Sequence, residues 1–133
     1  MVRKVLLTVL AVSTVFGVSV STAHAARKGS DTSSSISLNT SDPHLGGMVS
    51  FSVTYPSTVK SPRVAVRCYQ SGVLVYAEAG TAFESFQLGG GSSDWLRAGG
   101  PAQCTGELFY FIWKPNQPQE YYSLAWTSFD AAG

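Results

Sequence analysis

Histidine and cysteine are scarce in this sequence, and their scarcity excludes several kinds of chemistry. The chain has 133 residues but only two histidines and two cysteines. His24 belongs to an N-terminal segment that we expect to be removed, and His44, the remaining candidate base, has no Gly-x-Ser-x-Gly nucleophile motif beside it. A zinc site needs three or four His, Cys or carboxylate ligands, and one remaining histidine with two cysteines expected to form a disulfide cannot supply it. We therefore expect no catalytic residue, no metal and no cofactor.

An excess of charge of one sign is also missing. Nine basic residues oppose eight acidic ones, and removal of Arg3 and Lys4 with the N-terminal segment leaves seven against eight, a net charge of −1. Nucleic-acid binding requires a dense basic face, so nucleic acid is excluded as a partner. The carboxylates are scattered, and their spacing does not favour the facing pair that glycoside hydrolysis requires. We expect a protein that is not an enzyme.

Long apolar runs are absent except at the N-terminus. Arg3 and Lys4 precede an uncharged run over residues 5–20, and Ala23-His24-Ala25 places small residues at the two positions that signal peptidase reads. The run is shorter than the roughly 20 residues needed to cross a bilayer, which favours a signal peptide over a membrane anchor. We predict a signal peptide over residues 1–25, secretion to the extracellular space or the cell surface, and no membrane span after cleavage.

The rest of the chain divides into a short leader and one domain. Residues 26–35 are rich in serine and contain no apolar residue larger than alanine, a composition typical of a flexible leader. Residues 36–133 are enough for a single domain. We expect this domain to be monomeric.

The domain has strand patterns and no convincing helical period. Val49–Tyr55 alternates apolar with polar side chains, as a strand with one buried face does, and Gln70-Ser71-Gly72 predicts a hairpin turn. Residues 102–113 are apolar on both faces, which places this strand in the middle of a sheet and covered on both sides, or at an interface. Further strands are expected at residues 36–38, 63–70, 73–78, 83–88 and 121–129. About seven short strands, with all six prolines between them, predict an all-β fold, an immunoglobulin-like β-sandwich.

The two cysteines fall on inward-facing positions of two expected strands. Cys68 lies on the third strand and Cys104 on the next to last. In an immunoglobulin-like order these strands are neighbours in one sheet, so we expect a disulfide within that sheet; two buried free thiols are the alternative. A disulfide that closes a loop of this length stabilises a fold by about 3–4 kcal/mol in the chain-entropy model.

Three stretches resemble a known group of domains. They are Val49–Pro56, Arg63–Gln70, and Gly100–Thr105 with its continuation into Leu108–Phe111. Together they resemble small immunoglobulin-like domains carried by actinobacteria and their phages, over most of residues 49–129. The resemblance implies the fold and an extracellular setting, and no defined activity.

Aromatic residues suggest where a ligand binds. Exposed rings stack on sugars or anchor protein partners, whereas buried rings fill a core. Neighbouring residues on a strand point to opposite faces, so one of Tyr121 and Tyr122 is expected to leave the core. Trp113 lies at a strand end beside Lys114-Pro115, and Trp95 and Trp126 complete a cluster near the C-terminus.

These features predict a secreted, non-enzymatic binding or interaction module whose partner is an extracellular protein or a polysaccharide. One alternative is a proteinaceous inhibitor of an extracellular hydrolase, which would present the loop Ser92–Gly100. Another is a small-molecule carrier with a cleft between its sheets. The candidate ligand-binding residues are Trp95, Arg97, Trp113, Tyr121 and Tyr122.

Overall fold

The computed structural model describes residues 33–133, so the expected signal peptide and residues 26–32 of the expected leader lie outside the described part. The described chain forms eight strands and one short helix. In order they are β1 (Ser35–Leu38), β2 (Met48–Val49), β3 (Phe51–Thr54), β4 (Arg63–Gln70), β5 (Val73–Thr81), β6 (Phe86–Gln87), α1 (Asp94–Ala98), β7 (Ala102–Ile112) and β8 (Glu120–Ala131). The all-β prediction is confirmed.

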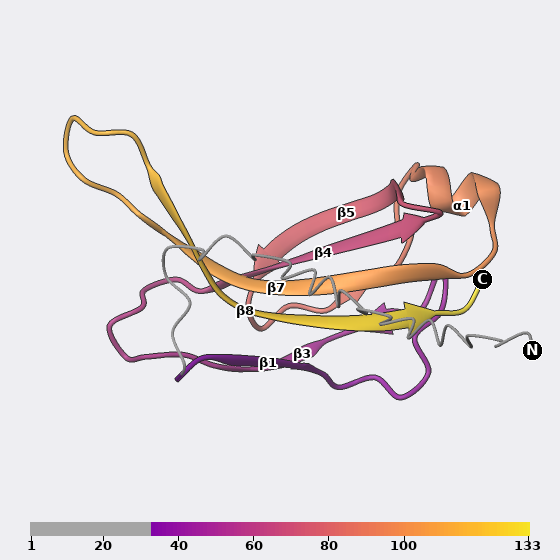
Figure 1. The fold of residues 1–133 in the computed structure, drawn as a ribbon, viewed down its shortest axis with the longest axis horizontal. Helices are drawn as coiled ribbons and strands as arrows, with labels where there is room; N and C mark the ends of the chain where they lie inside the picture. Colours follow the sequence, from indigo (N-terminus) through magenta and orange to yellow (C-terminus); the bar gives the residue numbers. More distant parts are fainter. Residues whose placement is uncertain (1–32) are drawn as a thin grey trace, which may run out of the picture.

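A four-stranded antiparallel sheet in the order β5-β4-β7-β8 is the largest element of the fold (Figure 1). The expected hairpin between β4 and β5 is present, and its turn residues Ser71 and Gly72 have φ values of 49° and 78°. Positive φ at both positions is what a two-residue turn needs to match the twist of the strands. Strand β7, apolar on both faces, lies between β4 and β8, so its expected central position is confirmed. The expected cover on both sides is not found, because the other strands of residues 33–133 lie over only one of its faces.

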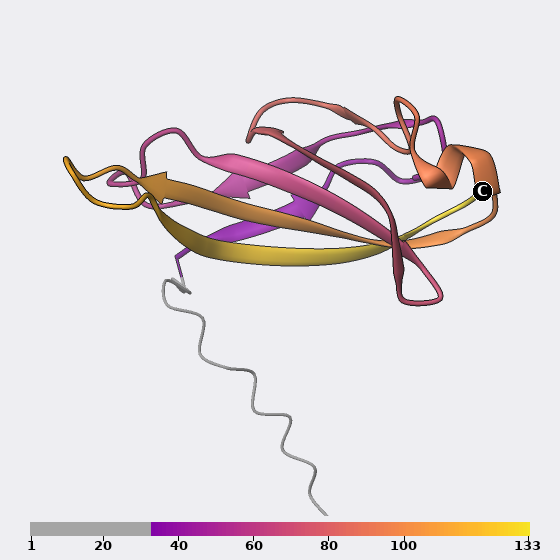
Figure 2. The same cartoon turned by 90° about the horizontal axis from the view of Figure 1, so that it is seen from above.

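A second layer covers one face of this sheet. The ribbon formed by β1 and β3 lies along β7 and β8, and the pair β2–β6 lies at its side (Figures 1 and 2). Phe51 of β3 approaches the sheet at Gly106 of β7, where an added Cβ would be 2.7 Å from a ring carbon of Phe51. Glycine at position 106 therefore lets the two layers meet closely.

The core lies between the layers. From the large sheet it takes the side chains on one face of β4 and β7, which we call the inner face, namely Val64, Val66, Cys68, Ala102, Cys104 and Leu108. Cys68 and Cys104 are directly opposite each other on β4 and β7, with 4.0 Å between their Cα atoms, and form a disulfide. The predicted pairing within one sheet is confirmed.

The strand count and one strand boundary differ from the sequence prediction. The segment Val49–Tyr55 divides into β2 and β3, because Val49 pairs with Phe86 whereas Phe51 pairs with Leu38 of a different sheet. Eight strands in three antiparallel sheets thus replace the expected seven. The first of them begins at Ser35, one residue before the expected start of the domain.

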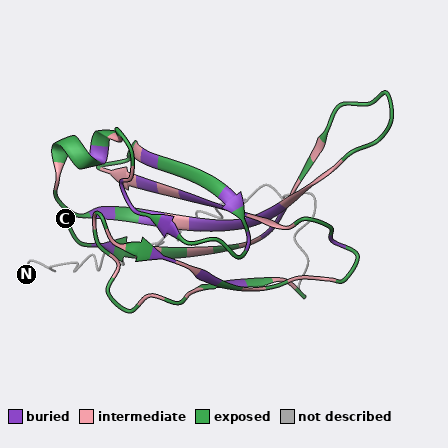
Figure 3. Cartoon of the chain, turned by 180° about the vertical axis from the view of Figure 1, so that it is seen from behind, coloured by how far each residue is buried: buried purple, intermediate pink, exposed green. Residues whose placement is uncertain are grey.

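The end of the β7–β8 hairpin projects away from the rest of the molecule (Figures 1 and 2). Leu108 pairs with Ala125 but Phe109 pairs with Ser123, so Leu124 is an extra residue on β8. Such a β-bulge bends the strand and increases its twist. Figure 3 shows that the projecting end is largely exposed, whereas buried residues follow the middle of β4 and β7.

Candidate functional site

The four-stranded sheet has a second face, which we call the outer face, and no other layer formed by residues 33–133 covers it. On β4 its side chains are those of Arg63, Ala65, Arg67 and Tyr69, which alternate with the core residues. Across β7 and β8 the same face carries a group of rings that we call the aromatic face, comprising Phe109, Phe111, Trp113, Tyr121 and Trp126. These five rings of the β7–β8 hairpin thus lie on one face of the sheet.

Three of these rings form a closed contact network. The centroid of Phe109 lies 5.4 Å from that of Phe111 and 5.3 Å from that of Tyr121, and Phe111 lies 5.8 Å from Tyr121. These separations are within the range of favourable aromatic pairs. Phe109 is 6% exposed, so it acts as a buried floor beneath the rings around it.

A buried carboxylate lies beside this network. Glu107 is only 1% exposed although it is on the outer face. The Nη1 of Arg67 donates to its Oε2 over 2.9 Å, and the hydroxyl of Tyr121 donates to its Oε1. A buried carboxylate is tolerated when it is paired and hydrogen-bonded in this way. Glu107 therefore positions Tyr121 and Arg67 and is not available to a ligand.

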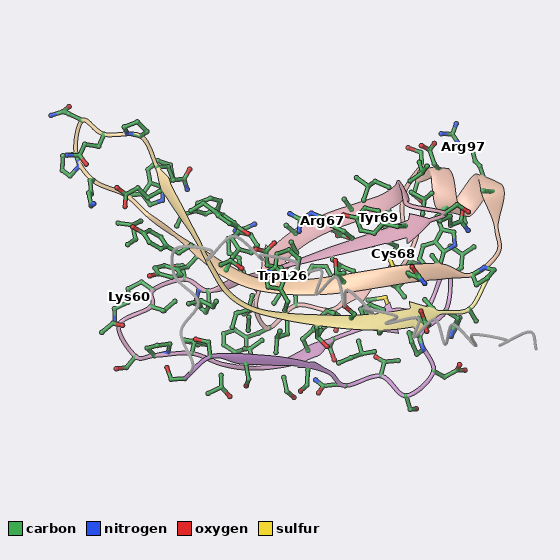
Figure 4. All side chains as sticks on the ribbon, viewed as in Figure 1. Lys60, Arg67, Cys68, Tyr69, Arg97 and Trp126 are labelled. Carbon is green, nitrogen blue, oxygen red and sulfur yellow. A yellow bond between two sulfur atoms is a disulfide. The ribbon has the colours of Figure 1, made fainter. Side chains whose placement is uncertain are left out.

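Three rings of the aromatic face remain open to solvent. Trp113 is 76% exposed, Tyr121 48% and Trp126 42%. Figure 4 shows Trp126 and Arg67 on the sheet at the bend of the hairpin, each next to Glu107 through cross-strand pairing or hydrogen bonding. Exposed rings on a supported face are able to stack against a flat partner.

A groove of about 540 Å³ adjoins the aromatic face. Its apolar wall consists of Phe109, Phe111 and Trp113. The polar and small residues on the other side come from the loop before β4, from β4 and β5, and from the hairpin end; they are Lys60, Ser61, Arg63, Ala79 and Gln119. No carboxylate is among these lining residues, all of which belong to the described part of the chain.

The structure separates the two adjacent tyrosines, as expected from strand geometry. Tyr121 belongs to the aromatic face, whereas Tyr122 points to the opposite side and stacks on Tyr110 with 5.3 Å between ring centroids. The hydroxyl of Tyr122 donates to Oε2 of Glu120 over 2.5 Å, and this hydrogen bond raises the pKa of Tyr122. Tyr122 therefore does not contribute to the aromatic face.

Trp95, a candidate ligand-binding residue from the sequence, is not accessible to a ligand in the structure. The expected loop Ser92–Gly100 contains α1, in which Ser93 caps the N-terminus by accepting from the Leu96 amide. Trp95 is fully buried, its indole N–H donates to the Gly100 carbonyl, and its ring lies 6.5 Å from that of Tyr76. A tryptophan that is buried and hydrogen-bonded within the core is not accessible to a ligand.

Arg97 is exposed but lies far from the aromatic face. It forms an ion pair with Asp94 on the same helix. Figure 4 shows Arg97 at the opposite end of the molecule from Lys60, one of the groove residues. The five predicted ligand-binding residues therefore do not form one site, because only Trp113 and Tyr121 come together.

Sequence reasoning missed the groove and its polar residues. Arg63 and Lys60 flank a proline and carry no motif, so only the sheet register brings them opposite Phe109 and Trp113. A signal for Glu107 does exist. It is the single charged residue in β7, a strand that is otherwise apolar on both faces near that position.

A larger groove of about 760 Å³ runs along β5 on the side away from β4. It is lined by Glu78 and Asp94 and by the glycine- and serine-rich loop over residues 90–93. Its single ring is that of Tyr76, which is only 6% exposed. This groove lacks the exposed aromatic surface that distinguishes the β7–β8 side.

Residues 33–133 hold no cluster of side chains suited to a metal ion, and no helix among them is long and apolar enough to span a membrane. Both cysteines of the chain are in the disulfide. No protein-family model, no curated protein and no solved structure matches this chain.

Proposed function

We propose that this protein is a secreted, non-enzymatic binding module with an immunoglobulin-like sandwich fold, and that its aromatic face recognises an extracellular polysaccharide. One observation carries the proposal. Trp113, Tyr121 and Trp126 are exposed on one face of the β7–β8 hairpin, next to buried residues that support them. Rings presented in this way offer flat apolar surfaces to the faces of sugar rings.

Burial does not explain these rings. A ring that fills a core loses its exposure, as Trp95 and Phe86 do in this protein. Trp113 keeps three quarters of its surface in solvent, so its large side chain contributes little to folding. Exposed aromatic groups that gather on one face mark a recognition surface more often than scattered ones do.

Secretion rests on the N-terminal sequence and agrees with the disulfide. Residues 1–25 have the charged start, apolar run and small-residue cleavage site of a signal peptide. Disulfides persist in oxidising compartments and are rare in the cytosol. The Cys68–Cys104 bond is therefore suited to a protein that acts outside the cell.

Cosedimentation of the purified secreted protein with insoluble polysaccharides and bacterial cell walls tests the proposal. We expect the protein to pellet with at least one matrix, and Trp113→Ala and Tyr121→Ala to remain in the supernatant. Phe83→Ala is the matched control, because Phe83 is 74% exposed but lies outside the aromatic face and the groove. The proposal would be rejected if the wild type and the three variants pelleted equally, or if none of them pelleted with any matrix.

A hydrolase inhibitor is the second candidate, and the rigidity of the α1 turn favours it. Ser93 and the buried Trp95 fix this turn, which presents Leu96 (54% exposed) and Arg97 to solvent. A rigid exposed loop loses little conformational entropy on binding. Inhibition of a secreted hydrolase by the wild type but not by Arg97→Ala would support this function in place of polysaccharide binding.

A further inference from the structure

We propose that the groove beside the aromatic face binds an acidic polysaccharide, with Arg63 and Lys60 receiving the carboxylates of uronic acid residues. This inference rests on the proposed function and specifies its ligand. The groove pairs an aromatic wall on β7 and the hairpin end with a cationic side formed by β4 and the loop before it. A uronic acid carries both complementary features, an apolar ring face and a carboxylate at its edge.

The distribution of ion pairs singles out this groove. Residues 33–133 contain five lysines and arginines. Three of them pair with carboxylates, namely Arg67 with Glu107, Arg97 with Asp94 and Lys114 with Glu120. The two cations that form no ion pair within the described residues are Lys60 and Arg63, and both line the groove. Among residues 33–133, the positive charge that no carboxylate compensates is thus concentrated in one place.

Of the two cations, Arg63 is better placed than Lys60 to bind a carboxylate of the ligand. Within residues 33–133 its guanidinium makes no hydrogen bond and no ion pair, so its five N–H donors are free. Lys60, by comparison, donates from Nζ to the Ser57 carbonyl over 3.2 Å. Arg63 also begins β4, opposite Thr81 on one side and Phe109 on the other, so its backbone is held by two strands. A planar guanidinium on a fixed backbone is well suited to bidentate carboxylate recognition.

The remaining lining residues suit a sugar better than an acidic peptide. Trp113 is the most exposed ring among residues 33–133 and lies against the same groove as Arg63. Ser61 and Gln119 provide a hydroxyl and an amide, which donate to and accept from sugar hydroxyls. Two cations are too few for nucleic acid, whose binding depends on many phosphate contacts. A polyuronate combines stacking, hydroxyl groups and a carboxylate in every residue.

Isothermal titration calorimetry with soluble polygalacturonate tests this proposal, with pullulan as the neutral polysaccharide and poly-glutamate as a polyanion without sugar rings. We expect the protein to bind polygalacturonate, to bind it more weakly as salt increases, and to bind neither control polymer comparably. Arg63→Gln should weaken binding by about 10-fold or more, since a charge-assisted hydrogen bond is lost. Arg63→Lys keeps the positive charge but loses the planar guanidinium that binds a carboxylate bidentately, so it should retain part of the affinity.

Arg97→Gln is the matched control, because it removes the same charge at the opposite end of the molecule. We expect its affinity to stay within about 2-fold of the wild type, since exposed charges distant from a ligand are largely screened. Equal losses in both variants, or none in Arg63→Gln, would reject the carboxylate site. Tight binding of pullulan would reject the acidic ligand but keep the proposed function. Comparable binding of poly-glutamate would reject the sugar specificity, and binding of no polysaccharide at all would reject both proposals.

Discussion

The two faces of the four-stranded sheet bury side chains by different means. On the inner face, Val64, Val66 and Leu108 are completely buried because a second layer covers them. On the outer face no layer is present, and burial comes from side chains that lie over one another, as Tyr121 and Arg67 cover Glu107. The inner face therefore stabilises the fold, whereas the outer face keeps exposed side chains that are available for recognition.

This difference also explains how one strand can be apolar on both sides. β7 contributes Leu108 to the core and Phe109, Phe111 and the preceding Glu107 to the outer face. The bulge at Leu124 bends the hairpin beyond this point, so the rings on the projecting end leave the core without joining another layer. An exposed ring on the outer face should then matter little for stability and much for binding.

The two tryptophans Trp95 and Trp113 provide the strongest test of this contrast. We expect Trp95→Ala to lower the free energy of unfolding by about 4 kcal/mol, because it empties a fully buried site. We expect Trp113→Ala to change it by no more than about 0.5 kcal/mol, since the ring is mostly in solvent. Urea unfolding followed by circular dichroism measures both values. Similar losses in the two variants would mean that the outer face is part of the core.

The Arg67–Glu107 pair tests a part of the outer face that is buried. Arg67→Met keeps an aliphatic side chain but leaves Glu107 without its cation, and we expect a loss of about 2–3 kcal/mol in the free energy of unfolding. Breaking a fully buried ion pair usually lowers the free energy of unfolding by about 3–5 kcal/mol. We expect a smaller loss here because the Arg67 side chain is 35% exposed. Urea unfolding at neutral pH checks it.

Arg63→Met is the matched control for that prediction. It lies on the same strand and the same face but has no carboxylate partner among residues 33–133, so we expect a change within about 0.5 kcal/mol. The double variant Arg67→Met with Glu107→Gln should recover part of the stability, since the uncompensated charge is removed. If Arg63→Met cost as much as Arg67→Met, the ion pair would not be the reason for the loss.

Much of the strand pattern could be predicted from the sequence because period-two alternation depends only on neighbouring residues. The hairpin at Ser71-Gly72, the central position of β7 and the disulfide within one sheet all followed from local pattern and strand order. The division of Val49–Tyr55 could not be predicted, since it depends on partners far away in the chain. Nor could α1, because a five-residue helix is too short to show a 3.6-residue period.

The candidate site was predictable only in part for a related reason. An exposed ring such as Trp113 could be expected from its place at a strand end beside Lys114-Pro115. Burial of Trp95 depends instead on its hydrogen bond to Gly100 and its contact with Tyr76, which no local pattern indicates. The groove depends on the register between β4 and β7, which brings Arg63 opposite Phe109.

Tyr76 provides the smallest test, on the edge strand β5 of the inner face. Burial raises the pKa of Tyr76 above its ordinary value of 10.0, and the hydrogen bond that its hydroxyl donates to Glu78 over 2.5 Å raises it further. Below pH 10 Tyr76 is protonated in both the folded and the unfolded chain, so its pKa does not affect stability. Above pH 10 the unfolded chain ionises first, and the free energy of unfolding falls as pH rises.

Tyr76→Phe removes the contribution of Tyr76 to the pH dependence of the free energy of unfolding. It also removes one hydrogen bond, that to Glu78. At pH 8 we expect the variant to be less stable than the wild type by about 1 kcal/mol, the usual net contribution of such a bond. Between pH 10 and about 11.5 the wild type should lose stability more steeply than the variant, so that their difference shrinks. Urea unfolding at each pH measures the difference in the free energy of unfolding between the two proteins. The other tyrosines are the same in both, so their ionisation cancels from this difference. A difference that stays constant through this range would show that solvent reaches Tyr76, and that the inner face is open at β5 in the way the outer face is open at Trp113.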